Sequence, residues 1–150
     1  MALIMQFSTR AQTIHKNIMS TSLKKKILGG NDCLEKMIGE NYTNCNFNVD
    51  SMARKLRISK VYLREIIGMQ YGISPQKLIE GFRLEKSLKL IEKDFTEYQI
   101  AKEVGYSSPR SYRRAFKLRF GILPSIYSKI SKSPSCNISK FHQELLEKLR

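Results

Sequence analysis

The clearest sign of the fold is the segment of residues 100–121, which reads IAKEVGYSSPRSYRRAFKLRFG. Ala101 provides a small side chain for a close helix crossing, and Gly105 allows a tight turn. Ser108 followed by Pro109 is typical of the first residues of a helix. A short helix, a tight turn and a capped second helix are the plan of a helix-turn-helix unit.

The same landmarks occur earlier in the chain, in the same order. Ser59, Leu63, Gly72 and Pro75 follow Ala53 at offsets of 6, 10, 19 and 22 residues, and Ser108, Tyr112, Gly121 and Pro124 follow Ala101 at offsets of 7, 11, 20 and 23. Each offset is one residue longer in the second copy, as a single residue inserted near Gly105 would produce. Internal repetition of this kind indicates two copies of one structural unit.

Apolar residues between positions 31 and 130 recur with the period of a helix, and no segment alternates as a strand does. We therefore expect an all-α fold in which two homeodomain-like helix-turn-helix subdomains, at about 50–72 and about 97–121, are joined by a linker helix at about 75–93. Helix starts are expected at Asp32, Asp50, Ser59, Ser74, Thr96, Ser108 and Pro124, and helix ends at Gly72, Gly105 and Gly121. A generic helical bundle with a chance internal similarity is the alternative.

The linker helix suggests how such a chain would meet DNA. At about 1.5 Å per residue it is nearly 30 Å long, and successive major grooves on one face of a duplex lie about 34 Å apart. A rigid spacer of this length would let one chain place a recognition helix in each of two successive grooves.

The second helix of the second unit has two contrasting sides. Its apolar stripe consists of Tyr112, Ala115, Phe116 and Phe120, whereas Arg110, Arg113, Arg114 and Lys117 project from the opposite side, with Arg119 at the edge. No acidic residue interrupts the cations along this helix. Five cations without a counter-charge repel one another, so we expect phosphates or base edges opposite them.

The composition supports a polyanionic partner. The 150 residues contain 27 Lys and Arg against 13 Asp and Glu, a net charge of +14, and 41% are hydrophobic. The length suits about one domain, and the chain is too hydrophobic for a disordered basic tail. The surplus of positive charge indicates either nucleic acid or an anionic membrane surface as the partner.

The two ends differ from the segment between them. Residues 1–30 carry +5 and contain a run of three lysines before Gly29 and Gly30, which predicts a basic flexible arm ending in a hinge. Residues 131–150 carry +2 and are expected to form a linker and a C-terminal helix capped by Ser139.

Cys33, Cys45 and Cys136 lie far apart in the sequence, with only two histidines to accompany them. We expect reduced thiols and no metal site. No apolar run approaches the length of about 18 residues that a membrane span needs, and the apolar start is too short for a signal peptide. The chain is therefore expected to be cytoplasmic, at the bacterial nucleoid.

The sequence resembles the DNA-binding domain of AraC/XylS-type transcription regulators over residues 32–129. The family pattern in the second unit reads I-A-x-x-x-G-F, then S-x-F-x-R-x-F-K, F-G and P, and here Tyr106 and Tyr112 replace two phenylalanines. The linker helix matches R-L-x-x-A-x-x-L-L, with Ser87 in place of Ala. The first unit departs more, because its usual arginine and aromatic positions hold Glu65 and Ile67.

The resemblance implies which residues meet double-stranded DNA. It assigns base reading to Val61, Arg64, Glu65, Pro109, Arg110, Arg113 and Arg114, and it makes Lys60, Lys102 and Lys117 candidate phosphate contacts. Glu65 could accept a hydrogen bond from a cytosine or simply weaken phosphate contact, in which case the first recognition helix would chiefly position the protein.

The resemblance also implies a sequence-specific transcription regulator that contacts RNA polymerase and activates transcription, not an enzyme and without a cofactor. Only about thirty residues precede the domain, too few for a barrel-like sensor, so no small-molecule effector site is expected. Three other functions stay open. These are coating of nucleic acid without sequence preference, DNA-repair alkyl transfer, for which the cysteines lack zinc-ligand neighbours, and a membrane-surface role for either end of the chain.

Overall fold

The computed structural model describes residues 31–133, 143 and 147. Seven helices follow one another in this part of the chain: α3 (Asn31–Asn41), α4 (Val49–Leu56), α5 (Lys60–Tyr71), α6 (Pro75–Glu92), α7 (Glu97–Glu103), α8 (Pro109–Phe120) and α9 (Pro124–Ser131). The all-α prediction is confirmed, with no strand among the described residues. The predicted basic arm and the helix capped by Ser139 lie outside them.

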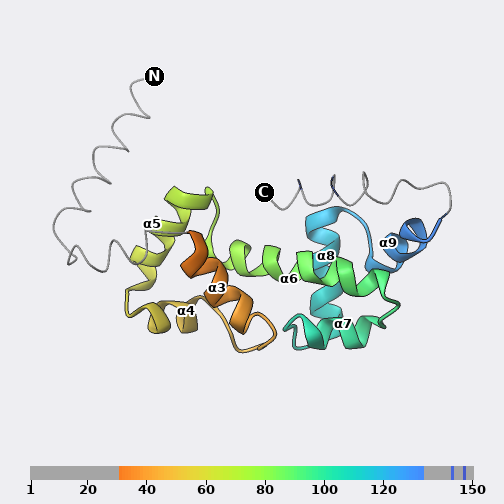
Figure 1. The fold of residues 1–150 in the computed structure, drawn as a ribbon, viewed down its shortest axis with the longest axis horizontal. Coiled ribbons are helices and arrows are strands. Elements are labelled where there is room, and N and C mark those ends of the chain that lie inside the picture. Colours follow the sequence, from red (N-terminus) through yellow and green to blue (C-terminus); the bar gives the residue numbers. More distant parts are fainter. Residues whose placement is uncertain (1–30, 134–142, 144–146, 148–150) are drawn as a thin grey trace, which may run out of the picture. The chain divides into compact units, whose positions relative to one another are not determined.

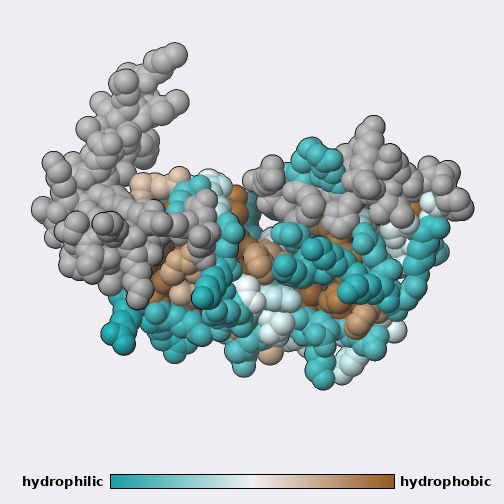
Figure 2. Space-filling model, viewed as in Figure 1, coloured by the Kyte–Doolittle hydropathy of each residue, from teal (hydrophilic) through white to brown (hydrophobic). Residues whose placement is uncertain are grey.

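The chain divides into two compact parts after Met37, and both helix-turn-helix units and the linker helix lie in the part that begins at Ile38. In Figure 1, α6 runs from the first helix pair, α4 and α5, to the second pair, α7 and α8, with α9 beyond them. Hydrophilic side chains cover much of the visible surface of these helices, and hydrophobic ones form smaller patches between them (Figure 2).

The first helix-turn-helix unit starts differently from the prediction. The cap of α4 is Asn48 and not Asp50, because the backbone is extended at Asn48 and its side-chain oxygen accepts from the Ser51 amide at 3.0 Å. The Ser51 hydroxyl in turn accepts from the Asn48 amide, so the two residues form a capping box. Asp50 lies in the first turn of the helix. The α5 helix begins as predicted, with Ser59 as its cap.

The remaining helix boundaries follow the sequence closely. Ser74, Thr96 and Ser108 cap α6, α7 and α8 as predicted, and each side chain accepts from an amide three residues on. Gly72, Gly105 and Gly121 all have positive φ just after a helix. Two predictions were slightly wrong: α6 ends at Glu92 with Lys93 as its cap, and α3 begins at Asn31, so Asp32 lies inside it.

The core of the second unit holds α8 in place. The predicted apolar stripe of α8 is buried as expected: Tyr112, Ala115, Phe116 and Phe120. The Phe116 ring lies between those of Tyr112 and Phe120, and it also contacts Tyr127 on α9. Ala101 on α7 is 2% exposed, as expected for the small residue at a close helix crossing. These contacts leave the opposite side of α8 open to solvent.

A buried arginine connects the linker helix to the loop between α3 and α4. Arg83 on α6 is 7% exposed, and it donates to three backbone carbonyls, those of Tyr42 at 3.0 Å, Asn44 at 2.9 Å and Phe47 at 3.1 Å. Burial lowers the pKa of Arg83, because its charge has lost water. The three carbonyls compensate for part of that loss.

The turn of the second unit touches the same loop. Gly105 has φ +81°, and a Cβ atom built on it would lie 1.9 Å from the Tyr42 carbonyl oxygen. The neighbouring Tyr106 ring lies 5.7 Å from the Arg83 guanidinium carbon. We call the set of Arg83, Gly105, Tyr106 and the loop of residues 42–47 the junction. It brings the loop that leads into the first helix-turn-helix unit against the turn of the second unit.

Substitution of Gly105 by alanine tests this close approach. Gly105→Ala and Gly121→Ala place alanine at nearly the same backbone angle, φ +81° and +78°, but only Gly105 has a neighbouring atom within 4 Å of the added Cβ. In both variants the left-handed backbone should lower the free energy of unfolding by about 1–2 kcal/mol. In Gly105→Ala, overpacking should lower it by about 1–3 kcal/mol more. Urea unfolding followed by circular dichroism measures both, and equal losses would rule out the contact.

Two tyrosine hydroxyls should have opposite effects on stability. The Tyr106 hydroxyl is buried without a hydrogen-bond partner among the described residues, whereas that of Tyr127 donates to Glu92 at 3.1 Å. Tyr106→Phe should therefore raise the free energy of unfolding by about 1 kcal/mol, and Tyr127→Phe should lower it by about 1 kcal/mol. Thermal unfolding of the two variants beside the wild type checks the signs. A lower free energy of unfolding in both variants would mean that the Tyr106 hydroxyl has a hydrogen-bond partner.

Candidate nucleic-acid interface

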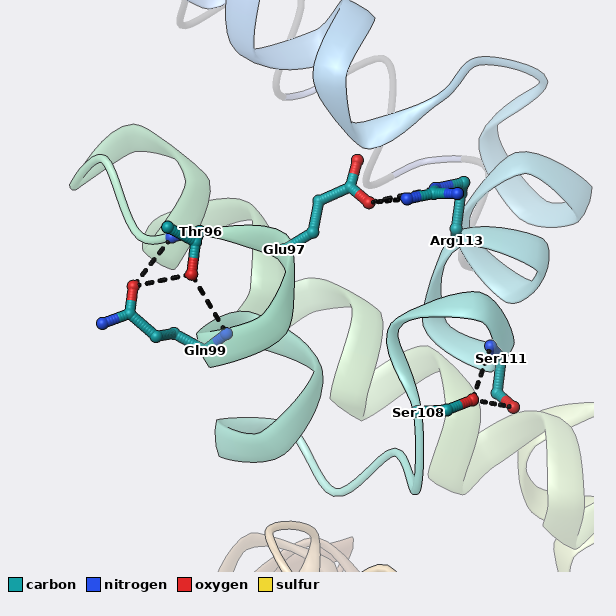
Figure 3. Close-up of polar contacts among 6 residues, drawn as sticks. All are labelled: Thr96, Glu97, Gln99, Ser108, Ser111 and Arg113. Carbon is teal, nitrogen blue, oxygen red and sulfur yellow. Dashed lines mark hydrogen bonds and ion pairs between the residues drawn. The ribbon is translucent and has the colours of Figure 1, made fainter.

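The α8 helix presents basic side chains from a firmly anchored backbone. The Ser108 hydroxyl accepts from the Ser111 amide at 3.2 Å and bonds the Ser111 hydroxyl at 2.9 Å, which fixes the first turn (Figure 3). The expected DNA-facing arginines, Arg110, Arg113 and Arg114, are all exposed, and so is Lys117 one turn further on. Pro109, also expected to read bases, is half-buried as the first residue of the helix.

One of these cations has a counter-charge that the sequence of α8 does not show. Arg113 donates through Nε at 3.0 Å and Nη2 at 2.6 Å to the same carboxylate oxygen of Glu97 (Figure 3). Glu97 lies at the start of α7, which packs against α8. The expectation of five cations without a counter-charge was therefore wrong, because the acid comes from a neighbouring helix. Because both side chains are partly exposed, the ion pair adds under about 1 kcal/mol to the free energy of unfolding.

Arg119 also differs from the expectation, because it is half-buried and its Nε atom has no contact with solvent. Its charge acts on Glu80 of the linker helix. Burial raises the pKa of Glu80, and the positive charge of Arg119 opposes that rise. Among the described residues, no acidic side chain pairs with the three remaining cations of α8, Arg110, Arg114 and Lys117. We call these three the open basic face.

The corresponding surface of α5 is nearly neutral. An offset of 49 residues aligns the two recognition helices and pairs Val61 with Arg110, Arg64 with Arg113, Glu65 with Arg114, Gly68 with Lys117 and Met69 with Leu118. All five α5 residues are exposed. Four cations on α8 thus correspond to one cation and one anion on α5. The two recognition helices offer different chemistry to a partner.

Met69 and Leu118 are interface candidates that the sequence reasoning missed. They occupy the same position in the repeat, and both are exposed, Met69 at 53% and Leu118 at 84%. Each lies four residues after a candidate base-reading residue, Glu65 or Arg114. The i, i+4 spacing places them on the same helix side as those residues, so this signal was available in the sequence.

The candidate phosphate contacts differ in their surroundings. Lys60 at the start of α5 pairs with Asp50 at 2.8 Å, and this contact lowers the pKa of Asp50. Lys102 is exposed in the last turn of α7, and Lys117 belongs to the open basic face. The positive charge available to a phosphate is thus greater in the second unit than in the first.

Two paired helices of this kind define the class of helix-turn-helix proteins. The family model for the helix-turn-helix domain matches residues 52–130, which is more than half of the chain. The chain belongs to the AraC/XylS type of this family, whose members are DNA-binding transcription regulators. Within the described residues, no helix is both long enough and apolar enough to cross a membrane.

Three similar proteins illustrate the match. The virulence regulon transcriptional activator VirF of Yersinia enterocolitica is 30% identical over 93 residues, which are 61% of this chain and 34% of VirF. The C-terminal domain of AraT, a response regulator from Geobacillus stearothermophilus, has a TM-score of 0.63 and 27% identity over 69% of this chain and 88% of that domain. The DNA-binding domain of AdpA, solved in complex with a target DNA, has a TM-score of 0.62 and 20% identity over 66% of this chain and 89% of its own.

The matching segment is a minor part of the curated relatives. It covers 34% of VirF and only 7% of a protein from Formosa agariphila named Histidine kinase P4, which is 28% identical over 93 residues. The domain therefore occurs within longer proteins of different overall names. What those proteins do as a whole is not a property of this segment.

Removal of the Glu97 carboxylate should strengthen binding to DNA. Glu97→Gln keeps the side-chain shape but releases Arg113 from its ion pair, so affinity for a duplex should rise several-fold at low salt. The slope of log K against log salt should steepen by up to about one, the value for one added phosphate contact. Fluorescence anisotropy over a salt series measures both quantities.

The matched control for this experiment is Glu103→Gln, which removes the same charge from the same helix. Glu103 is exposed at the end of α7 and pairs with no cation among the described residues. Its substitution should change affinity and salt slope much less than Glu97→Gln does. Equal effects of the two substitutions would mean that the ion pair with Glu97 does not weaken the contact of Arg113 with DNA.

Proposed function

We propose that this protein is a sequence-specific regulator that places α5 and α8 in two successive major grooves of double-stranded DNA and activates transcription. The open basic face of α8 is the observation that carries the proposal. Three exposed cations without an acidic partner among the described residues project from the side of the helix opposite its buried stripe. Phosphates and base edges supply the negative potential that such a face lacks.

The linker helix supports simultaneous binding by both units. α6 has 18 residues, which at 1.5 Å each give a length of about 27 Å. The centres of two half-sites one helical turn apart are separated by about 34 Å. The two lengths are of similar size, and α5 and α8 both pack against α6.

The two recognition helices have different roles in this proposal. On α8, Arg110, Arg113 and Arg114 would read guanine through bidentate contacts to O6 and N7, with Pro109 against the base edges. Arg113 would exchange or share its contact with Glu97 as it does so.

On α5, Val61 would contact a thymine methyl group, Arg64 a guanine, and Glu65 the N4 amino group of a cytosine. Contacts of Lys60, Lys102 and Lys117 with phosphates would fix the register without specifying sequence.

Activation is proposed from similarity to a relative, and a contact with RNA polymerase is the means of activation that goes with it. The relative VirF is named a transcriptional activator, and the AdpA domain with the same fold was solved with a target DNA. Coating of nucleic acid without sequence preference is the competing function. A titration of the protein on duplexes selected from a random pool and on unselected duplexes, over a salt series, separates the two. Equal affinity for both kinds of duplex at every salt concentration would exclude the regulator.

Arg114 should be a base-reading residue. Arg114→Ala should cost about 1–3 kcal/mol of binding free energy on the selected duplex and much less on unselected DNA, because a bidentate base contact is lost only where the base is present. Lys129→Ala is the matched control, since it removes an exposed cation from α9. It should weaken binding to both duplexes by the same small amount. A loss of equal size on both duplexes for Arg114→Ala would make it a phosphate contact.

A further inference from the structure

We propose that Arg83 is a positioning residue that sets the spacing between the two DNA half-sites that this protein accepts. The inference rests on the proposed function, since it concerns how two recognition helices fit one duplex. It assigns a role in DNA selection to a residue that is 7% exposed and lies far from both recognition surfaces along the chain.

The first step is the connection from Arg83 to the first unit. Its guanidinium donates to carbonyls at three points of the loop of residues 42–47, which leads directly to Asn48, the cap of α4. The loop itself is compact, because the Phe47 amide donates to the Asn44 carbonyl at 3.0 Å and the Phe47 side chain is 3% exposed. A planar guanidinium that bonds three carbonyls fixes their relative directions. The start of α4 is thereby fixed to α6.

The second step is the connection from Arg83 to α8. The Tyr106 ring packs against the guanidinium, and the same ring lies 5.7 Å from that of Tyr112, a fully buried residue of α8. Gly105 fills the remaining space, since even one added carbon would overlap the Tyr42 carbonyl that accepts from Arg83. One guanidinium therefore contacts the loop before α4 and the turn before α8.

The third step is the geometry of the duplex. With 10–10.5 base pairs per turn, each base pair added between two half-sites rotates one against the other by about 34° and moves it by about 3.4 Å. Two recognition helices held by a rigid junction can match only one such arrangement. A junction without its central hydrogen bonds lets the units rotate about the ends of α6, so the penalty for a wrong spacing becomes smaller.

The test uses the full chain and a duplex selected from a random pool, together with duplexes that have one base pair inserted or deleted between the half-sites. The measured quantity is the ratio of the dissociation constants for the altered and the original spacing. A loss of folded protein weakens binding to all duplexes by the same factor and leaves this ratio unchanged. The ratio therefore separates a positioning role from a merely structural one.

For the wild type we expect a ratio of at least about 30, because a half-site that is displaced loses the contacts to one or more of its base pairs. Arg83→Met keeps the side-chain stem but removes the hydrogen-bond donors, and its ratio of dissociation constants should fall to about five or less. Arg83→Lys keeps the charge without the planar fork, and its ratio should lie between those two. Lys89→Met, a cation lost from the exposed surface of the same helix, is the control and should keep the wild-type ratio.

The possible outcomes are distinguishable. If Arg83→Met keeps the wild-type ratio, the positioning role is overturned and the proposed function stays intact. If the Met variant does not fold, the same conclusion follows when Arg83→Lys keeps the wild-type ratio. A wild type that binds selected and unselected duplexes equally overturns the proposed function, and the positioning role with it. A reduced ratio in the Arg83 variants with a normal ratio in the control supports both.

Discussion

The hydrogen bonds from Arg83 to three backbone carbonyls hold the loop before the first helix-turn-helix unit against the linker helix. A buried guanidinium without acceptors would be strongly destabilising, and so would three buried carbonyls without a donor. Both groups are satisfied only when α6 lies against the loop of residues 42–47. Gly105 then allows the turn of the second unit to approach the same loop, and the Tyr106 ring contacts the guanidinium. The core of α8 and the cap of α4 are thus related through one side chain.

This arrangement presents two recognition helices of unequal charge. The α8 helix offers the open basic face, whereas the matching side of α5 combines Arg64 with Glu65 and two exposed apolar residues, Val61 and Met69. In the proposed function, the second unit therefore supplies most of the electrostatic attraction, and the first unit contributes contacts that depend on shape and on apolar groups. The pair between Arg113 and Glu97 moderates the charge of α8, so the attraction to random DNA is smaller than the sequence of that helix alone indicates.

Much of the fold was predictable because helix starts and ends are coded locally. Serine caps, proline at the first position and glycine after the last turn act within four residues, and the repeat showed them twice. The cap at Asn48 was missed because two polar residues competed for one helix start. The partners of Arg113 and Arg83 were missed for a different reason. Glu97 is 16 residues away and the three carbonyls are 36 to 41 residues away, so only packing brings them together.

In the proposed function, one chain reads two successive major grooves with different chemistry in each. Guanine methylation interference on a selected duplex can detect this arrangement, because N7 methylation blocks arginine contacts in the major groove. We expect two contacted segments about one helical turn apart on one face, with strong interference clustered in the half bound by α8 and weak interference in the half bound by α5. A single contacted segment, or equal and diffuse interference along the duplex, would contradict it.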